Sequence, residues 1–523
     1  RIIGHLMCST HRANSLESND MHGTSRSEID TRLKTGTAGL DIVLHGGLTP
    51  NRLYLVEGTP GSGKTTLALK FLLDGREQGK RGLYITLSET EEELRASSRS
   101  HGWSLEGIDL CEMVDEYEFG SDHEQSLLHP SEVELGETVR HVIELVEEID
   151  PACVVLDSLS ELRLLAQNSL RYRRQILALK HFFARRKCTV LMLDDRTAEP
   201  SDMQLHSIAH GVISLEQEAN DFGSERRRLR VVKLRGVKYS GGYHDFTIEK
   251  GGVRVYPRLI ASDHHREFSA EPVTTGLAGL DGLLGDGLFP GTNTLLSGPA
   301  GVGKTTTAVL CMLAALKRGE TAAYFLFDER LATLLTRSKA LDMDLQPYID
   351  SGQLQIRQID PAELSPGQFA SEVRQAVEQD GASVIVIDSL NAYLHAMPSD
   401  NFLILQMHEL LSYLAQQGVV SLMILGQHGI TGELRSDIDV SYLADTVMML
   451  RFFEVGGVVR KSVAVIKTRT SDHERTVREF TINKNGVSIG DPIRSFSGIL
   501  SGTPVLTSSN ETLMPLGTGA GDS

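Results

Sequence analysis

The sequence repeats itself, and this repeat limits the possible folds more than any other feature. Residues 35–66 and residues 275–306 are identical at 17 of 32 positions without a gap, at a constant offset of 240. The identical positions include Asp, Pro, Lys and Leu in a fixed order, which excludes a chance match between low-complexity segments. Further along, residues 153–162 correspond to residues 384–393. The chain is therefore interpreted as a tandem duplication of one domain of about 230–240 residues.

The boundaries of the two copies follow from changes in composition. We expect a first domain over residues 28–260 and a second over residues 273–500, separated by a polar linker at residues 261–272 that ends in Pro. Residues 1–27 are rich in Ser, Asn and His without periodicity and are expected to form a disordered N-terminal tail. Residues 501–523 are rich in Gly, Ser and Thr and are expected to form a flexible C-terminal tail.

Within each copy the hydrophobic pattern alternates between strands and helices. Leu53–Glu57 is a short apolar run, and Thr66–Arg76 has apolar residues at helical spacing. Val154–Leu156 and Val190–Leu193 are continuous apolar runs, which suit strands that are buried on both faces of a parallel sheet. The pattern predicts an α/β fold in which each domain has a central, mostly parallel sheet flanked by helices.

Composition narrows the classes of protein further. The formal charge of −17 disfavours a general binder of polyanions, because phosphate neutralisation requires clustered Lys and Arg. No stretch approaches 18 consecutive apolar residues, so no membrane-spanning helix is expected. The beginning of the sequence lacks the apolar core of a signal peptide. Five scattered cysteines without a CxxC pair argue against a zinc site or a disulfide scaffold. These features predict a cytoplasmic protein.

Both copies contain a phosphate-binding loop. The segments 58–65 and 298–305 fit the pattern GxxxxGK[ST], each after a predicted strand and before a predicted helix. In this pattern the glycines let backbone N–H groups point at phosphate oxygens, and the Lys reaches the β- and γ-phosphates. The predicted nucleotide-binding residues are Gly58, Thr59, Pro60, Gly61, Ser62, Gly63, Lys64, Thr65 and Thr66 in the first copy, and Gly298, Pro299, Ala300, Gly301, Val302, Gly303, Lys304, Thr305 and Thr306 in the second.

Acidic residues at the ends of predicted strands complete the pattern of a nucleotide hydrolase. Asp157 and Asp388 each end an apolar strand and precede Ser-Leu, so they are predicted to help hold Mg²⁺ together with Thr65 and Thr305. The alternative for each Asp is an ordinary turn at the end of a strand.

Glu89 and Glu329 follow the next predicted strand at the same offset of 240. We predict that each is a catalytic carboxylate that orients or deprotonates the attacking oxygen. The alternative is a solvated acid that caps a helix, since three further glutamates follow closely at residues 91–93.

Taken together, the duplicated loops, the GLDxxLxxGL segment before each loop and the acids resemble the KaiC family of clock ATPases and autokinases. The resemblance covers about residues 30–505 and includes the segments IDSL (387–390), ADTVMML (444–450) and SGILSGTP (497–504). It implies two tandem RecA-like P-loop domains that bind ATP and Mg²⁺. It also implies a homo-hexamer of two stacked rings with ATP between neighbouring subunits, and a role in signalling or timing. The second domain would act as a serine/threonine autokinase.

The resemblance also assigns roles to individual residues. The family has a Glu-Glu pair in each domain, which corresponds here to Ser88-Glu89 and to Asp328-Glu329, so Asp328 joins the predicted catalytic residues. The family's phosphoacceptors align with Ser441 and Ser436, and Tyr442 replaces the family's second acceptor. A further set of basic residues is implied to contact the γ-phosphate bound by the adjacent subunit: Lys233, Arg235, Lys467 and Arg469.

Two other classes of function stay open at this point. The first is a nucleotide-gated scaffold with little turnover, which the missing carboxylate at Ser88 favours. The second is a RecA/RadA-like DNA-dependent ATPase, which the net charge disfavours. The basic run at residues 225–230 is interpreted as a hairpin edge or a subunit contact, because no aromatic residues alternate with it to stack on bases. Protein partners are expected, if anywhere, at the C-terminal tail or the ring faces.

Overall fold

The computed structural model contains two α/β domains and confirms the predicted fold class. The predicted N-terminal tail 1–27, the predicted phosphoacceptor Ser436 and most of the segment 501–523 lie outside the residues that the structure describes. The described residues are 32–113, 130–166, 168–196, 203–219, 223–395, 400–427, 440–483, 486–500 and 504–506.

Among these residues, the first domain is built on a nine-stranded sheet. Its strands are β1 (Leu53–Gly58), β2 (Gly82–Thr86), β3 (Ile108–Glu112), β4 (Cys153–Asp157), β5 (Thr189–Asp195), β6 (Gly211–Glu218), β7 (Arg226–Leu234), β8 (His244–Glu249) and β9 (Gly252–Tyr256). They lie in the order β3-β2-β4-β5-β1-β6-β7-β8-β9. The strands from β3 to β6 are parallel, and β7, β8 and β9 continue the sheet in antiparallel pairs.

Helices cover both faces of this sheet. They are α2 (Ala38–Val43), α3 (Lys64–Glu77), α4 (Glu91–Ser100), α5 (Pro130–Ile149), α6 (Leu159–Ala166), α7 (Ser169–Arg186) and α8 (Met203–Ile208). Side chains of α2, α3 and α4 form one core with alternate strand residues such as Tyr54 and Val56. Side chains of α5, α6 and α7 form a second core with the intervening residues such as Leu53 and Leu55. Burial on both faces explains why these strands are continuous apolar runs.

The second domain repeats this architecture after the short 3₁₀-helix η2 (Ala261–Asp263). Its strands are β10 (Asn293–Gly298), β11 (Ala322–Leu326), β12 (Leu354–Gln358), β13 (Val384–Asp388), β14 (Val420–Gly426), β15 (Thr446–Val455), β16 (Val458–Lys467), β17 (Arg478–Asn483) and β18 (Gly486–Pro492). Their order, β12-β11-β13-β14-β10-β15-β16-β17-β18, is that of the first sheet. A separate ribbon pairs β19 (Phe496–Ser497) with β20 (Val505–Leu506).

The helices of the second domain also form two layers. They are α9 (Ala278–Leu284), α10 (Lys304–Lys317), α11 (Leu331–Ala340), α12 (Gln346–Asp350), α13 (Pro366–Glu378), α14 (Leu390–His395) and α15 (Asp400–Gln416), with the 3₁₀-helix η3 (Ser441–Leu443) before β15. The layer of α9 to α11 and the layer of α13 to α15 pack on opposite faces of the sheet. No helix of the described residues has the length and apolar character that a membrane span requires.

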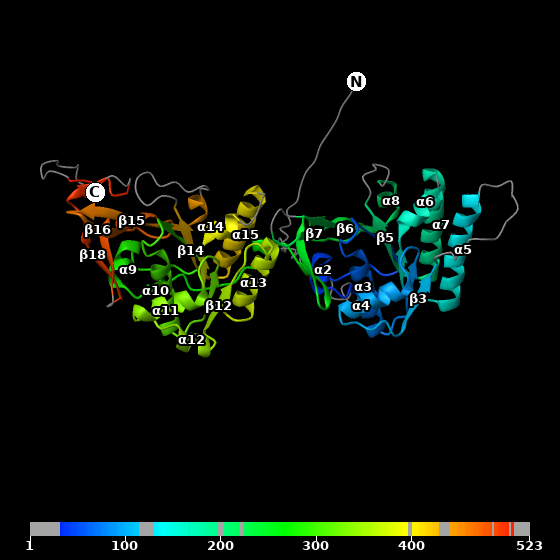
Figure 1. The fold of residues 1–523 in the computed structure, drawn as a ribbon, viewed down its shortest axis with the longest axis horizontal. Coiled ribbons are helices and arrows are strands. Elements are labelled where there is room, and N and C mark those ends of the chain that lie inside the picture. The colour runs from blue at the N-terminus through cyan, green and yellow to red at the C-terminus, as the bar shows by residue number, and fades with distance from the viewer. Residues whose placement is uncertain are drawn as a thin grey trace, which may run out of the picture.

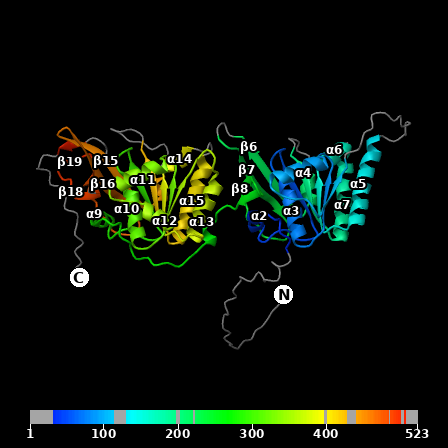
Figure 2. The same cartoon turned by 60° about the horizontal axis from the view of Figure 1, so that its bottom comes forward.

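The two domains lie end to end along the long axis of the molecule (Figures 1 and 2). The antiparallel edge of the first sheet, with β7 and β8, faces α13 and α15 of the second domain, and α5 and α7 lie at the far end. The domains therefore meet through unlike surfaces, a sheet edge on one side and a helical layer on the other.

A buried carboxylate holds this contact together. Asp245 of β8 is 8% exposed and accepts a hydrogen bond of 2.7 Å from the backbone N–H of Gly367, in the first turn of α13. Burial raises the pKa of Asp245, and the bond from Gly367 acts in the opposite direction. Two loop contacts lie nearby: Ser224 N–H donates to Ala362 O, and Arg226 donates to Pro361 O, both at 3.2 Å.

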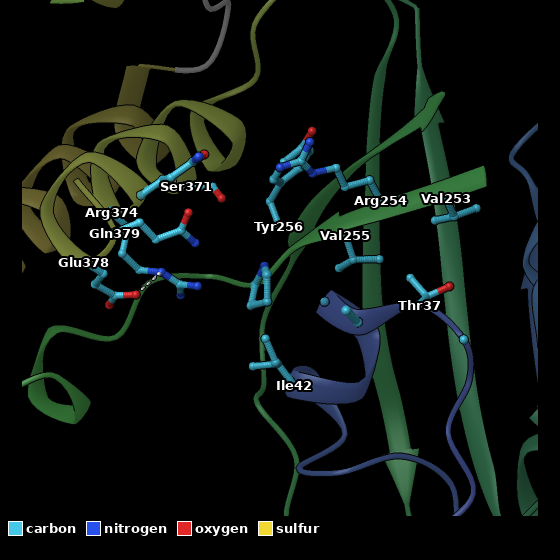
Figure 3. A pocket seen from close by; sticks show the side chains of 15 residues that line it. Thr37, Ile42, Val253, Arg254, Val255, Tyr256, Ser371, Arg374, Glu378 and Gln379 are labelled. Atoms are coloured by element: carbon cyan, nitrogen blue, oxygen red, sulfur yellow. Dashed lines mark ion pairs between the residues drawn. The ribbon is translucent and has the colours of Figure 1, made fainter. Parts of the chain in front are cut away.

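Beside this contact the domains separate. A cavity of about 380 Å³ lies where α2 and β9 face the C-terminal half of α13 (Figure 3). Arg374 on α13 lines it and forms an ion pair of 3.4 Å with Glu378. The N-terminal end of α13 is thus the attachment point between the domains, and its other half borders open space.

This arrangement predicts the effect of removing the carboxylate. Replacing Asp245 by Ala deletes an acceptor at a helix N-terminus, which costs about 1 kcal/mol. We expect limited proteolysis to cleave the linker 261–272 about five times faster, because each 1.4 kcal/mol is a factor of about ten. Asp245→Asn keeps an acceptor oxygen and should stay close to the unaltered rate. Equal cleavage rates in all three proteins would contradict the prediction.

Candidate nucleotide sites

Each phosphate loop connects the central strand of its sheet to a helix that begins at the loop lysine. In the first domain the loop joins β1 to α3, and Gly63 at its end has φ of 96°, in the left-handed region. Gly303 has the same place in the second domain, with φ of 119°. The positive φ would strain any other residue at either position, and an added Cβ would also lie 2.7 Å from Ile248 Cδ1 or 2.5 Å from Ile482 Cδ1, so these side-chain ends would have to move. The local fold therefore presents helix-terminal N–H groups, as anion binding requires.

The two loop lysines fold back over their own loops. Lys64 Nζ donates to the carbonyl oxygens of Gly58 and Thr59, both at 3.0 Å, and Lys304 Nζ makes the equivalent two bonds at 2.8 Å. Each lysine is 8% exposed. Burial lowers the pKa of Lys304 to about 8. Both ammonium groups thus lie at the loop, where phosphate oxygens would replace the carbonyl partners.

The predicted magnesium residues come together in both domains. Thr65 Oγ1 donates to Asp157 Oδ2 at 3.3 Å, and Thr305 Oγ1 donates to Asp388 Oδ2 at 2.8 Å. Burial raises the pKa of both aspartates. A carboxylate and a hydroxyl beside a phosphate loop fit Mg²⁺, which takes few protein ligands and completes its shell with phosphate and water.

Sequence reasoning missed a tyrosine at each of these aspartates. Tyr84 OH donates to Asp157 Oδ2 at 2.5 Å, and Tyr324 OH donates to Asp388 Oδ2 at 2.7 Å. Both tyrosines are fully buried in the strand next to the aspartate. A signal for them does exist, because Tyr84 and Tyr324 are related by the same offset of 240 as the loops.

The predicted catalytic acids lie after β2 and β11, next to the magnesium residues. Burial raises the pKa of Glu89, and the nearby Asp157 adds to the shift. Burial also raises the pKa of Glu329, although the positive charge of Arg337 lowers it in part. Arg337 holds Glu329 through two parallel bonds of 3.0 and 2.9 Å. Arg337 is a residue that the sequence analysis did not identify.

The first position of each acid pair differs between the domains. In the second domain Asp328 accepts a short hydrogen bond from Ser389, the residue that follows Asp388. In the first domain Ser88 stands at this position, and its backbone N–H donates to Thr86 Oγ1 at 3.4 Å. Asp328 therefore contacts the residue next to Asp388, which is predicted to hold Mg²⁺. The first domain has Ser88, and so no carboxylate, at the position of Asp328.

The predicted basic residues lie at the other end of the sheet. Lys233 is opposite Val212 at the start of β6, and Lys467 is opposite Val447 at the start of β15. Val212 and Val447 pair with Leu55 and Leu295, which lie three residues before Gly58 and Gly298, so roughly 10 Å of strand at about 3.3 Å per residue separates the lysine backbones from the loops. Both Nζ atoms point the other way and donate to carbonyl oxygens that precede β6 and β15. The structure thus does not bring these lysines to the loop of their own domain.

In the second domain the basic pair surrounds a predicted phosphoacceptor. Lys467 Nζ donates to Ser441 O at 3.2 Å and to Ala444 O at 2.7 Å, and Arg469 donates to Tyr442 O at 3.2 Å. Ser441 in η3 therefore lies at the edge opposite its own loop.

The first domain has the same arrangement around different side chains. Lys233 donates to the carbonyl oxygens of His206 and Ala209, and Arg235 donates to Ser207 O at 2.6 Å. His206 thus takes the place that Ser441 has in the second domain. The His206 side chain extends toward the loop, because its Nε2 lies 2.8 Å from Oε2 of Glu57, the residue of β1 that precedes Gly58.

Comparison with known proteins gives one consistent result. The family model described as KaiC ATPase matches residues 33–260 and again residues 273–493. The circadian clock protein KaiC3 of Synechocystis sp. is 27% identical over 494 residues, which cover 92% of this chain and 96% of that protein. The circadian clock oscillator protein KaiC of Synechococcus elongatus is 26% identical over 504 residues, which cover 94% of this chain and 95% of that protein. With the duplicated fold and the loops, these matches show that the chain belongs to the KaiC family of ATPases.

Proposed function

We propose that this protein is a Mg²⁺-dependent ATPase whose nucleotide sites form between neighbouring copies of the chain, and whose second domain transfers phosphate to Ser441. The observation that carries the proposal is the division of each site. The loop, the magnesium residues and the catalytic Glu lie at one edge of the sheet, and Lys467, Arg469 and Ser441 lie at the opposite edge. A neighbouring subunit is required to bring the two sets together.

The proposed hydrolysis uses groups at both edges. The loop N–H groups and Lys304 hold the β- and γ-phosphates of ATP, and Mg²⁺ held by Thr305 and Asp388 would neutralise phosphate charge. Glu329 accepts a proton from a water molecule as the water oxygen bonds to the γ-phosphorus. The bond between that phosphorus and the β–γ bridging oxygen breaks, and ADP leaves with the bond electrons. Lys467 and Arg469 of the neighbour balance the charge that develops on the transferred group.

Autophosphorylation follows the same path with a different nucleophile. The Oγ of Ser441 from the adjacent subunit takes the place of water, loses its proton to Glu329 and becomes bonded to the γ-phosphorus. Tyr442 is 52% exposed and replaces the family's second acceptor, so we propose a single phosphorylated side chain in this segment. A ring of six subunits, as the family resemblance implies, would supply each site with its second half, and the resulting protein would serve signalling or timing.

One observation favours a second candidate function, a nucleotide-gated scaffold. The first domain has Ser88 where the second has Asp328, so its ring would turn over slowly and would chiefly stabilise assembly. Nothing comparable favours a DNA-dependent motor. The basic run at β7 is occupied by neighbouring groups: Arg227 pairs with Glu225 at 2.6 Å, Arg228 pairs with Glu218, and Arg230 lies 3.9 Å from Glu216.

Transfer between subunits can be tested by mixing two variants. Neither Lys304→Ala nor Ser441→Ala should label itself efficiently from γ-labelled ATP, since one lacks the second loop and the other lacks the acceptor. When the two are mixed and reassembled, we expect label on Ser441 of the Lys304→Ala chain, identified by peptide mapping. Free phosphate without protein label would leave an ATPase alone, and ATP-dependent assembly without either product would favour the scaffold.

Glu329 can be tested separately from binding. In a chain whose first loop is disabled by Lys64→Ala, we expect Glu329→Gln to reduce ATP turnover by about a hundredfold or more, because removal of a general base costs 10²–10⁴. The affinity for ATP should change little, as measured by equilibrium binding. Unchanged turnover would contradict the assignment of Glu329.

The pKa of Lys304 makes nucleotide affinity depend on pH. Bound phosphates favour the ammonium form and so raise the pKa of Lys304 above about 8. ATP affinity of the second domain should be constant below pH 8 and should fall by up to about tenfold per pH unit above it. The measurement is the Kd for ATP between pH 7 and 9.5 in the Lys64→Ala chain. Lys304→Arg keeps its charge over this range and should remove the dependence, whereas a flat profile with Lys304 present would contradict it.

A further inference from the structure

The two phosphate loops differ in the partner of the loop lysine. Lys64 Nζ forms an ion pair of 2.7 Å with Asp195 Oδ1, in addition to its two bonds to loop carbonyls. Lys64 is 8% exposed and Asp195 is 35% exposed at the side chain. Within the part of the chain that the structure describes, Lys304 forms no ion pair. One carboxylate therefore distinguishes the lysine of the first loop from the lysine of the second.

The register of the sheet explains this difference. Asp195 is the last residue of β5 and lies beside Gly58, the residue at which the first loop begins. The corresponding pair in the second domain is Gly426 beside Gly298. Gly426 has no side chain, and its backbone N–H and C=O bond to the amide of Asn391 at 2.5 and 3.0 Å. The end of β5 thus places the carboxylate of Asp195 against Lys64, whereas the equivalent end of β14 has only Gly426 and places no charge near Lys304.

The position of this carboxylate matters for a triphosphate. The loop lysine reaches the β- and γ-phosphates when a nucleotide is bound, so a carboxylate that contacts its nitrogen lies in the region of the terminal phosphate. Asp195 also contributes to the raised pKa values of Glu89 and Asp157, which places its charge within the same cluster. Binding of any nucleotide must break the ion pair between Lys64 and Asp195. A γ-phosphate is in addition repelled by the negative charge of Asp195.

We propose that Asp195 is a specificity-determining residue of the first site, which holds Lys64 while the loop is empty and shifts the preference of that site from ATP toward ADP. This rests on the proposed function, in which both loops bind adenine nucleotides. The second site, with Gly426 at the equivalent position, has no such bias. The two rings of one assembly would then differ in nucleotide state under the same ratio of ATP to ADP.

Two reciprocal substitutions test the proposal. Each domain is measured in the full-length chain with the other loop disabled, by Lys304→Ala for the first site and by Lys64→Ala for the second. The readout is the ratio of the Kd for ADP to the Kd for ATP, measured with Mg²⁺ present. Asp195→Gly should raise this ratio in the first site by about tenfold, and Gly426→Asp should lower it in the second site by a similar factor.

The structure offers matched controls for both substitutions. Asp195→Asn keeps the shape and removes the charge, so it should behave as Asp195→Gly does. Asp195→Glu keeps the charge and should leave the ratio within about twofold of the unaltered value. Gly426 is outside the left-handed region, and a Cβ there would lie 3.2 Å from Asn391 Oδ1, a side-chain atom that can move. An effect of shape alone would alter the Glu variant and leave the Asn variant unchanged, which is the opposite of the expected pattern.

The possible results separate this proposal from the proposed function. If the unaltered first site binds neither nucleotide, the proposed function fails for that domain. If it binds both but the ratio is the same in Asp195→Gly, the proposal about Asp195 is wrong while the proposed function stands. If Asp195→Gly abolishes hydrolysis without changing either Kd, Asp195 acts on the reaction and not on selection, which also overturns the proposal.

Discussion

The direction of the parallel strands is the constraint on which both sites depend. In a parallel sheet all carboxyl ends lie at one edge, so β1, β2 and β4 deliver the loop, Glu89 and Asp157 to one place. The same geometry sends Lys233 and Arg235 to the other edge, where β6 begins. In the proposed function, a single domain of this kind carries half of each of two sites, and the need for a neighbouring subunit follows from the topology of the sheet.

Duplication preserved this constraint and let the side chains around it diverge. The order of the nine strands, the GxxxxGK[ST] pattern of the loop and the Thr and Asp predicted to hold Mg²⁺ are the same in both domains. The differences lie near the strand ends. Glu57 in the first domain corresponds to Ser297 in the second, and His206 corresponds to Ser441. The backbone there is held by the same lysine and arginine bonds in both domains, so these positions could change without altering the fold. One scaffold thus supports two chemically distinct nucleotide sites.

The sequence allowed the fold class and both loops to be predicted, because glycines, strand ends and apolar runs are local patterns that the repeat shows twice. The ends of the predicted helix Thr66–Arg76 and strand Leu53–Glu57 lie within two residues of those of α3 and β1. The bond between Thr65 and Asp157 could be inferred because the motif brings these residue types together. The ion pair between Lys64 and Asp195 could not, since it depends on the register between two strands that are far apart in the sequence. Arg337 was missed for a different reason: its partner Glu329 lies eight residues away, before α11 begins, and no motif marks the pair.

The cap that Asp245 forms on α13 couples the residues that each domain can carry at this contact. Gly367 approaches so closely that a Cβ there would lie 2.9 Å from the Asp245 carboxylate. A side chain at residue 367 would therefore require Asp245 or α13 to move. A chimera that joins the first domain of this protein to the second domain of a relative would have to carry over β8 and the first turn of α13 together. Recombination between such proteins would therefore have to keep the two contacting segments, β8 and the first turn of α13, from the same parent.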